Sequence, residues 1–274
     1  MEEIKKLSVI IVTYNSEPDI YECLDALFTH NDIGEALEVI IVDNNSQHFE
    51  PMKQRIVELY NDMVIVLHNN NNGGYGQGNN IGIKHASSPI IMIMNPDVRL
   101  IQISFKEIIS RYQQDQNLAI VGFRQVLNYE GKKGTSFSLL NHIHGLIRLV
   151  GGILAKRLDC FCWKYMYFCG ACFCVRKSMF KQAGLFDENI FLYGEENDIH
   201  YRIHSIFKKA HDFYLRQVIY LHPTENRTYN EKTIEQRIVS NEYVMQKQGR
   251  APGTYIRSEK QRYYWTKLLI PNAK

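Results

Sequence analysis

The sequence predicts an α/β fold, with a mostly parallel central sheet flanked by helices and a helical extension at the C-terminus. Two observations in the first half of the chain lead to this prediction. Four short apolar runs, rich in Val and Ile, alternate with longer stretches of helical periodicity. Each run is apolar at consecutive positions, which is typical of parallel strands that are buried on both faces.

The predicted elements follow in order along the chain. Strands are expected at Leu7–Thr13, 38–43, 63–67 and Ile90–Met94, and helices at 16–30, 50–60 and 79–85. The second half is less regular, and its elements are predicted as an amphipathic helix or flap at 135–157, a strand at 166–175, a helix at 196–208, a strand at 218–221 and a helix at 232–248. Since no linker rich in Pro, Gly or Ser divides the chain, we expect one compact domain followed by the extension.

Composition and charge narrow the classes of function. The net charge of +3 is too small to predict a nucleic-acid partner. Residues 247–274 carry seven Lys or Arg against the single acid Glu259, a pattern that suits an anionic surface or an ordinary solvated face. The N-terminus does not resemble a signal peptide, and no apolar run reaches the ~18 residues of a membrane span. We therefore expect a cytoplasmic protein, with at most peripheral membrane contact.

Five of the six cysteines lie between Cys160 and Cys174. The spacing of Cys169 and Cys172 allows a zinc site. Their aromatic and apolar neighbours instead favour a buried strand, in which free cysteines act as small apolar side chains.

Polar residues follow the predicted strands, where parallel sheets bind their ligands. Thr13, Tyr14 and Asn15 follow the first strand. Asp43 ends the second in the motif IIVDNNS, where its carboxylate would accept hydrogen bonds from a base such as uracil or thymine, or would cap the next helix. The glycine-rich residues 69–80 follow the third strand, and their glycines would allow the backbone to approach a ligand closely. The alternative is a tight turn without a binding role.

The fourth strand leads into Asn95, Pro96 and Asp97, which makes Asp97 a candidate ligand for Mg²⁺ or Mn²⁺ or a helix cap. His222 follows the predicted strand at 218–221 and is a further candidate metal ligand or phosphate contact, although lone histidines are more often structural.

Residues 186–198 hold five carboxylates among aromatic residues, a setting that favours a general base. Acids there also suit the first turn of a helix.

The ordered motifs SVIIVTYN, EVIIVDNNS, NGGYGQGNNIG, MNPDV, CGACFCVRKSMF and GLFDENIFLYGEENDIHYRI resemble the family-2 glycosyltransferases, particularly their rhamnosyltransferase-like branch. The resemblance runs from about Leu7 to His222. It implies a GT-A fold, a nucleotide-sugar donor, a divalent cation (Mg²⁺ or Mn²⁺) and inversion at the anomeric carbon. It also implies a GT-A domain over 1–228, with a nucleotide-binding half (1–127) and an acceptor-binding half (128–228), and an extension over 229–274.

The resemblance also assigns roles by position. The implied donor-binding residues are Thr13, Tyr14, Asn15, Asp43, Asn45, Gly74, Asn80 and Asn95. Asp97 matches the second carboxylate of the family's metal motif, while Asn95 replaces the first, so metal binding would depend more on the diphosphate or on His222. Glu196 occupies the position of the general base, with Asp198 and then Glu195 as the next candidates.

The expected reaction transfers a sugar to an acceptor hydroxyl in bacterial surface polysaccharide synthesis, such as capsule or O-antigen. Rhamnose from a dTDP donor is the first expectation and a hexose from a UDP donor the second. The basic residues within 135–164 suit a lipid-linked oligosaccharide acceptor, and a second copy of the chain is a further candidate partner. A nucleotide-sugar-binding module without turnover is the main alternative. A nicotinamide-dependent oxidoreductase is disfavoured, because no glycine fingerprint follows the first strand.

Overall fold

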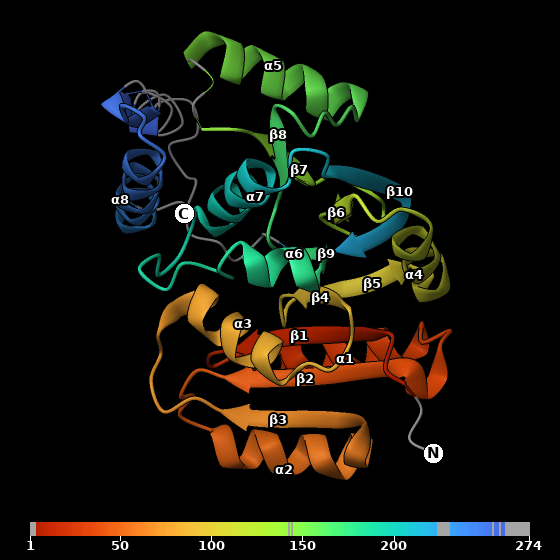
Figure 1. Cartoon of the computed structure of the whole chain (residues 1–274). Helices are drawn as coiled ribbons and strands as arrows, with labels where there is room; N and C mark the ends of the chain where they lie inside the picture. Colours follow the sequence, from red (N-terminus) through yellow and green to blue (C-terminus); the bar gives the residue numbers. More distant parts are fainter. Residues whose placement is uncertain are drawn as a thin grey trace.

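A computed structural model describes residues 4–141, 143, 145–223, 231–253, 255–257, 259 and 260. The main sheet in this part of the chain has eight strands in the order β3-β2-β1-β4-β9-β6-β10-β5. The strands of the first half, β1 (Leu7–Thr13), β2 (Leu37–Asp43), β3 (Val64–His68) and β4 (Ile90–Met94), are parallel (Figure 1). All four were predicted from their continuous apolar runs, with bounds that differ by at most one residue.

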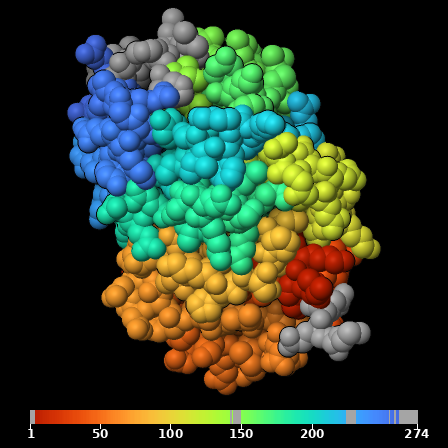
Figure 2. Space-filling model, viewed as in Figure 1, coloured from red at the N-terminus to blue at the C-terminus, as the bar shows by residue number. Residues whose placement is uncertain are grey.

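The second half extends the same sheet. Two strands, β6 (Leu118–Val126) and β10 (His211–Leu221), are parallel to each other, and β9 (Cys172–Arg176) lies antiparallel between β4 and β6. The edge strand β5 (Arg99–Gln102) is antiparallel to β10. The prediction of a mostly parallel sheet is therefore confirmed. In Figure 2 the first half, red to orange, and the second half, green to blue, form one continuous body.

Helices cover both faces of the sheet because successive strand residues point to opposite sides. One face packs against α1 (Asp19–Thr29), α2 (Phe49–Tyr60) and α4 (Phe105–Gln114). The other packs against α3 (Gly74–His85), α6 (Lys177–Gln182) and α7 (Glu195–Ile206). In β1, for example, Val9 and Ile11 belong to the first core and Ile10 to the second. Short 3₁₀ turns at η1 (Gly34–Ala36) and η2 (Asn61–Met63) precede β2 and β3.

Several predicted elements differ from the structure, and the strand predicted at 218–221 is only the end of the longer β10. The strand predicted at 166–175 is two strands: β8 (Met166–Phe168) pairs with β7 (Phe137–Leu139) in a separate two-stranded sheet, and only β9 enters the main sheet. The chain bends at Gly170, whose carbonyl accepts a hydrogen bond from the Tyr75 hydroxyl at 2.7 Å. Residues 135–157, predicted as a helix or flap, contain β7 and most of α5 (Gly145–Leu158).

The cysteines correct one further expectation. Cys172 and Cys174 are buried in β9 as expected, whereas Cys160 and Cys162 lie exposed between α5 and β8. All six are free thiols.

The last described helix, α8 (Glu231–Lys247), lies beside α7 (Figure 1). The Ser240 hydroxyl donates to the Leu192 carbonyl at 2.8 Å, and Lys247 pairs with Asp198 of α7. The predicted domain boundary at residue 228 lies outside the described residues, as does most of the basic stretch 247–274. Across the described helices, none combines the length and apolar character that a membrane crossing requires.

Candidate active site

The polar strand ends lie along one edge of the sheet. Because β1, β2, β4 and β10 run in the same direction, the residues that follow them emerge at the same edge, and antiparallel β9 begins there. Thr13 is paired in register with Asp43, and Ile11 with Met94, the residue before Asn95. Parallel pairing thus brings together segments that are 30 to 200 residues apart in the chain.

Asp43 organises the ends of β1 and β2. Its buried carboxylate accepts hydrogen bonds from the Thr13 hydroxyl at 2.8 Å, the Ser46 amide at 2.8 Å and the Ser46 hydroxyl at 2.5 Å. The Asn15 amide donates to the same Ser46 hydroxyl at 2.8 Å. Asn15 and Asn45 have positive φ values of 50° and 66°, which Asn tolerates better than most residues.

These turns border a hollow of about 130 Å³ between the ends of β1 and β2, lined by Asn15, Ser16, Glu17, Ser46, Gln47, His48 and Met52. Tyr14 beside it is 52% exposed. Asp43 does not cap the next helix, because α2 begins at Phe49 with His48 at its N-cap position; its carboxylate instead holds the turn at Ser46. The base-binding role stays a prediction.

The glycine-rich stretch forms the first turns of α3, which begins at Gly74 and not near residue 79 as predicted. Gly74 has φ +86°, and a Cβ there would lie 2.3 Å from the Phe191 carbonyl oxygen. That oxygen also accepts the Tyr75 amide at 3.1 Å. A Cβ at Gly78 would collide with Val12 of β1 at 2.7 Å. In this structure, the glycines allow α3 to pack closely against β1 and the segment before α7.

Asn80 holds this segment in place. Its side-chain oxygen accepts the Phe186 amide at 3.0 Å, and its nitrogen donates to the Phe186 carbonyl at 2.9 Å and to Glu188 at 3.0 Å. Asn80 thus contacts residues 186–188, while Gly74 lies against Phe191 and its carbonyl accepts a hydrogen bond from the Asn44 side chain at 2.9 Å. Their predicted contact with the donor stays a prediction.

Asp97 and His222 are brought together from β4 and β10. The His222 Nε2 lies 3.2 Å from the Asp97 Oδ1. The His222 side chain is 3% exposed and the Asp97 side chain 30%, so the pair is open on the carboxylate side. One carboxylate oxygen and one imidazole nitrogen suit a divalent cation that takes its remaining ligands from phosphate or water.

The segment that contains Gly170 and Ala171 joins this pair to the acids of α7. The Asn95 amide donates to the Ala171 carbonyl at 2.8 Å. A Cβ placed on Gly170 would lie only 1.8 Å from the Glu196 Oε1, so the Glu196 carboxylate rests directly on this glycine. The backbone of Asn95, two residues before the predicted metal residue Asp97, and the predicted base Glu196 therefore contact the same short piece of backbone.

The three acids of α7 have different surroundings. Glu195 is 1% exposed, and burial, together with the nearby Glu196, raises the pKa of its carboxyl well above the usual value. The fully buried Asp198 pairs with Arg202 at 2.7 Å and Lys247 at 3.1 Å. Arg202 lies one helical turn after Asp198, so this is a pair within α7. Only Glu196 is partly exposed, which leaves it the carboxylate that a substrate can reach.

Two residues of this site were missed from the sequence. The pKa of the partly buried Tyr75 is raised well above its usual value by burial and then by Glu196 and Glu195, and its hydroxyl donates to the Gly170 carbonyl at 2.7 Å. Gly170 lies within the quoted motif CGACFCV, and its glycine is the signal that could have drawn attention to it.

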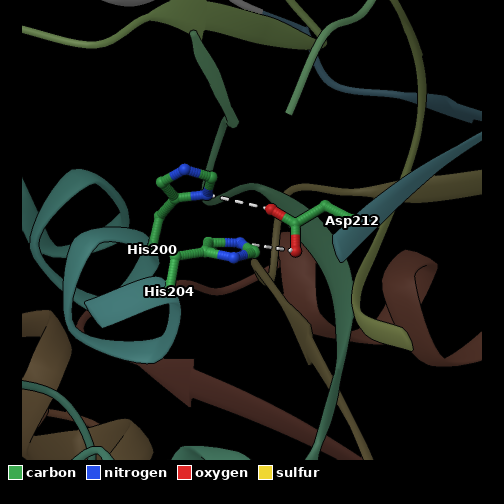
Figure 3. A group of neighbouring side chains, drawn as sticks. All are labelled: His200, His204 and Asp212. Atoms are coloured by element: carbon green, nitrogen blue, oxygen red, sulfur yellow. Dashed lines mark hydrogen bonds and ion pairs between the residues drawn. The ribbon is translucent and has the colours of Figure 1, made fainter. Parts of the chain in front are cut away.

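A second cluster of ionisable groups was also missed. His200, His204 and Asp212 meet between α7 and β10 (Figure 3). The spacing of the two histidines, four residues apart in a predicted helix, was its signal in the sequence.

Comparisons with known proteins agree with this geometry. The chain is 27% identical over 208 residues to the low-salt glycan biosynthesis hexosyltransferase Agl10 of Haloferax volcanii, a match that covers 72% of this chain and 61% of the relative. The chain thus spans about three fifths of that relative's length.

Two solved structures share the fold. The mannosyltransferase PcManGT of Pyrobaculum calidifontis, in complex with GDP-Man and Mn²⁺, superposes with a TM-score of 0.66 at 16% identity, over 96% of this chain and 70% of that one. S. aureus TarS 1-349 with UDP-GlcNAc gives 0.60 at 17%, over 88% and 65%. At these identities the likeness shows the GT-A fold alone.

The model of the family described as "Glycosyl transferase family 2" matches residues 8–184, which is more than half of the 274 residues. The matched region contains the strand ends at Thr13 and Asp43, the glycine-rich start of α3, Asp97 and Gly170. The chain therefore belongs to glycosyl transferase family 2.

Proposed function

We propose that this glycosyltransferase transfers a sugar from a nucleoside-diphosphate donor to an acceptor hydroxyl, with inversion at the anomeric carbon and with the help of a divalent cation. One observation carries the proposal: the segment of Gly170 and Ala171 contacts both the Glu196 carboxylate and the backbone of Asn95. Asn95 lies two residues before Asp97, which pairs with His222. A transferase of this kind needs a site for diphosphate charge next to a base.

The donor nucleoside would bind at the hollow between the ends of β1 and β2, near Asn15 and Asp43. The two structural neighbours are complexes with GDP-Man and UDP-GlcNAc, which supports a nucleotide-sugar donor for this chain. Rhamnose from a dTDP donor is our first proposal and a hexose from a UDP donor the second. A panel of nucleotide sugars, screened by thermal stabilisation, distinguishes them, because a ligand that binds only the folded state raises the Tm.

Asp97 and His222 would hold the cation, which PcManGT binds as Mn²⁺. When bound, the cation neutralises the charge that develops on the diphosphate leaving group. Asn95 occupies the first position of the metal motif and carries no charge. Asp97 is therefore the negatively charged ligand that this motif contributes to the cation.

Glu196 would remove the proton of the acceptor hydroxyl at a carboxylate oxygen. The hydroxyl oxygen would then attack the anomeric carbon from the side opposite the diphosphate, which inverts the configuration. Such a base typically contributes ~10²- to 10⁴-fold to the rate. Burial and then the nearby Glu196 raise the pKa of Glu195 well above its usual value, which disfavours a second negative charge beside the base.

The acceptor would be a lipid-linked oligosaccharide of a bacterial surface polysaccharide, such as capsule or O-antigen, used at the cytoplasmic face of the membrane. Basic residues within 135–164, including Lys156 and Arg157 at the end of α5, support an anionic acceptor and peripheral membrane contact. Self-association as a homodimer is part of the same proposal.

The test compares the variant Glu196→Gln with Glu235→Gln, an exposed glutamate on α8. The first should bind the donor normally and turn it over at least ~100-fold more slowly, while the second should match the wild type. Donor hydrolysis, in which water replaces the acceptor, provides the assay. A folded Glu196→Gln enzyme with normal turnover would refute the assigned base. A wild-type chain that binds every donor and hydrolyses none, with or without Mn²⁺, would favour the binding-module alternative.

A further inference from the structure

A second pocket of about 260 Å³ runs along the side of α7 that carries His200 and His204. We call it the α7 pocket. Its helix residues recur every three to four positions and so form one face of the helix. The lining consists of Leu140, Trp163, Lys164, Asn197, His200, Tyr201, His204, Ser205, Lys208, Gln248 and Arg250.

The charge of the α7 pocket is positive. Lys164, Lys208 and Arg250 line it, and none of its lining residues is an acid. Within the described part of the chain, no carboxylate forms an ion pair with any of these three cations. Lys164 lies over the Trp163 ring at 5.7 Å and Arg250 over the Tyr201 ring at 5.6 Å, which keeps both cations on aromatic walls of the pocket.

The pocket also contains buried donors without an acceptor. Asn197 is 2% exposed, and its side-chain Nδ2 has no hydrogen-bond partner among the described residues. The Gln248 Nε2 is likewise buried and unpartnered there. Burying such groups without partners destabilises a fold, so most buried polar groups in proteins are satisfied. Two unsatisfied N–H donors in one pocket indicate a ligand with acceptor oxygens.

Figure 3 shows how the histidines of the pocket are oriented. The His200 Nδ1 lies 2.9 Å and the His204 Nε2 3.1 Å from different oxygens of the buried Asp212 carboxylate. These hydrogen bonds lower the pKa of Asp212 in spite of its burial, so each of these nitrogens donates to an ionised carboxylate. The other nitrogen of His204, Nδ1, is buried without a partner, and its ring stacks on Trp163 at 4.9 Å.

The same three side chains would suit a metal ion, because one ligand atom of each lies within 4.8 Å of the others. Two features favour an anion instead. The carboxylate is already satisfied by two hydrogen bonds, and the three cations that line the pocket would repel a metal ion.

We infer that the α7 pocket binds a phosphate group of the acceptor substrate. The inference rests on the proposed function, and it names the class of acceptor. Glu196 lies four residues before His200, one helical turn of about 5.4 Å, so a bound phosphate would anchor the acceptor beside the base. Lys and Arg cations with N–H donors are the groups that bind phosphate oxygens in proteins. A polyprenyl diphosphate lipid and a soluble phosphodiester polyol share this chemistry.

The first test titrates inorganic phosphate and glycerol 3-phosphate into the wild-type chain by calorimetry, with glycerol as the uncharged control. Both phosphates should bind and glycerol should not. The double variant Lys208→Gln/Arg250→Gln should bind phosphate at least ~10-fold more weakly, since hydrogen bonds to charged groups are lost. Lys209→Gln, the exposed lysine next to Lys208 that does not line the pocket, should bind like the wild type.

A second variant guards against misfolding. Asn197→Asp keeps the size of the side chain and adds a negative charge to the pocket, so it should abolish phosphate binding while the Tm and nucleotide binding show a folded protein. Phosphate affinity that is unchanged in both pocket variants would overturn the inference. Zinc binding by the wild type with no phosphate binding would overturn it in favour of the metal site.

Two further arms identify the source of the phosphate. Phosphatidylcholine vesicles with and without polyprenyl diphosphate test the lipid, and glycerol phosphodiester oligomers test the soluble polyol. If the lipid vesicles or the oligomers bind and inorganic phosphate competes with them, the inference is supported, and the ligand that binds identifies the source of the phosphate. Vesicle binding that persists in Lys208→Gln/Arg250→Gln counts against the pocket. Since phosphate binding needs no turnover, it would survive if Glu196→Gln proved fully active, and the two proposals fail separately.

Discussion

Replacing Gly170 with Ala tests whether the position of the Glu196 carboxylate controls turnover. The added Cβ would lie 1.8 Å from the Glu196 Oε1, 2.8 Å from its Cδ and 3.1 Å from its Cγ. Ordinary van der Waals contact begins at 3.4 Å, so the carboxylate oxygen must move by about 1.6 Å, the difference between 3.4 and 1.8 Å. Gly170 does not have a positive φ, so the backbone accepts Ala without strain.

The expected result is a large loss of rate with little loss of stability. A partly exposed carboxylate can swing away from the new methyl group, which limits the cost in folding free energy. A displacement of about 1 Å at a reacting group costs on the order of 100-fold in rate. We therefore expect kcat for donor hydrolysis to fall ~100-fold in Gly170→Ala, with donor affinity unchanged. Kinetics, calorimetric donor titration and the Tm measure these three quantities.

The control is Gly253→Ala, because a Cβ at that glycine meets no atom within 4 Å. It should retain wild-type kcat. The double variant Gly170→Ala/Glu196→Gln should be no slower than Glu196→Gln alone, because both changes remove the same group from the reaction. A folded Gly170→Ala enzyme with wild-type kcat, or strictly additive losses in the double variant, would refute the reasoning.

Three further predictions concern the other acids. Burial raises the pKa of Glu195 in the folded chain, so the unfolded chain releases this proton at a lower pH. The free energy of unfolding should therefore fall as the pH rises above 4.5, the ordinary pKa of a glutamate. Urea unfolding at several pH values should show this fall in the wild type and not in Glu195→Gln. Asp198→Asn leaves Arg202 without its anion and Lys247 with Asp187 alone, so it should lower the free energy of unfolding by about 3 kcal/mol. A large kcat loss at unchanged stability would instead make Asp198 the base. Asp97→Asn should weaken Mn²⁺-dependent donor binding at least ~10-fold and leave nucleotide binding without metal unchanged. If the variant and the wild type depended equally on Mn²⁺, Asp97 would not be a metal ligand.

Much of the fold could be read from local patterns. The four strands of the first half are buried on both faces, so continuous apolar runs marked them within one residue. In contrast, β5, α4 and β6 were not predicted, although Ser104 caps α4 by accepting the Glu107 amide at 3.2 Å. The strand predicted at 166–175 was split at Gly170, because Tyr75 and Glu196, both distant in sequence, occupy the space around that glycine.

For the candidate site, the sequence by itself determined which residues end the parallel strands, and therefore that Thr13, Asp43 and Asn95 share one edge of the sheet. Only the tertiary structure decided which acid of α7 is accessible, since this depends on the cations that reach Asp198 and on the burial of Glu195. The same holds for Asp97 and His222, which meet because the edge strand β5, starting two residues after Asp97, pairs antiparallel with the end of β10. Strand order and side-chain packing are set by contacts between distant segments, and a local sequence pattern carries no information about such contacts.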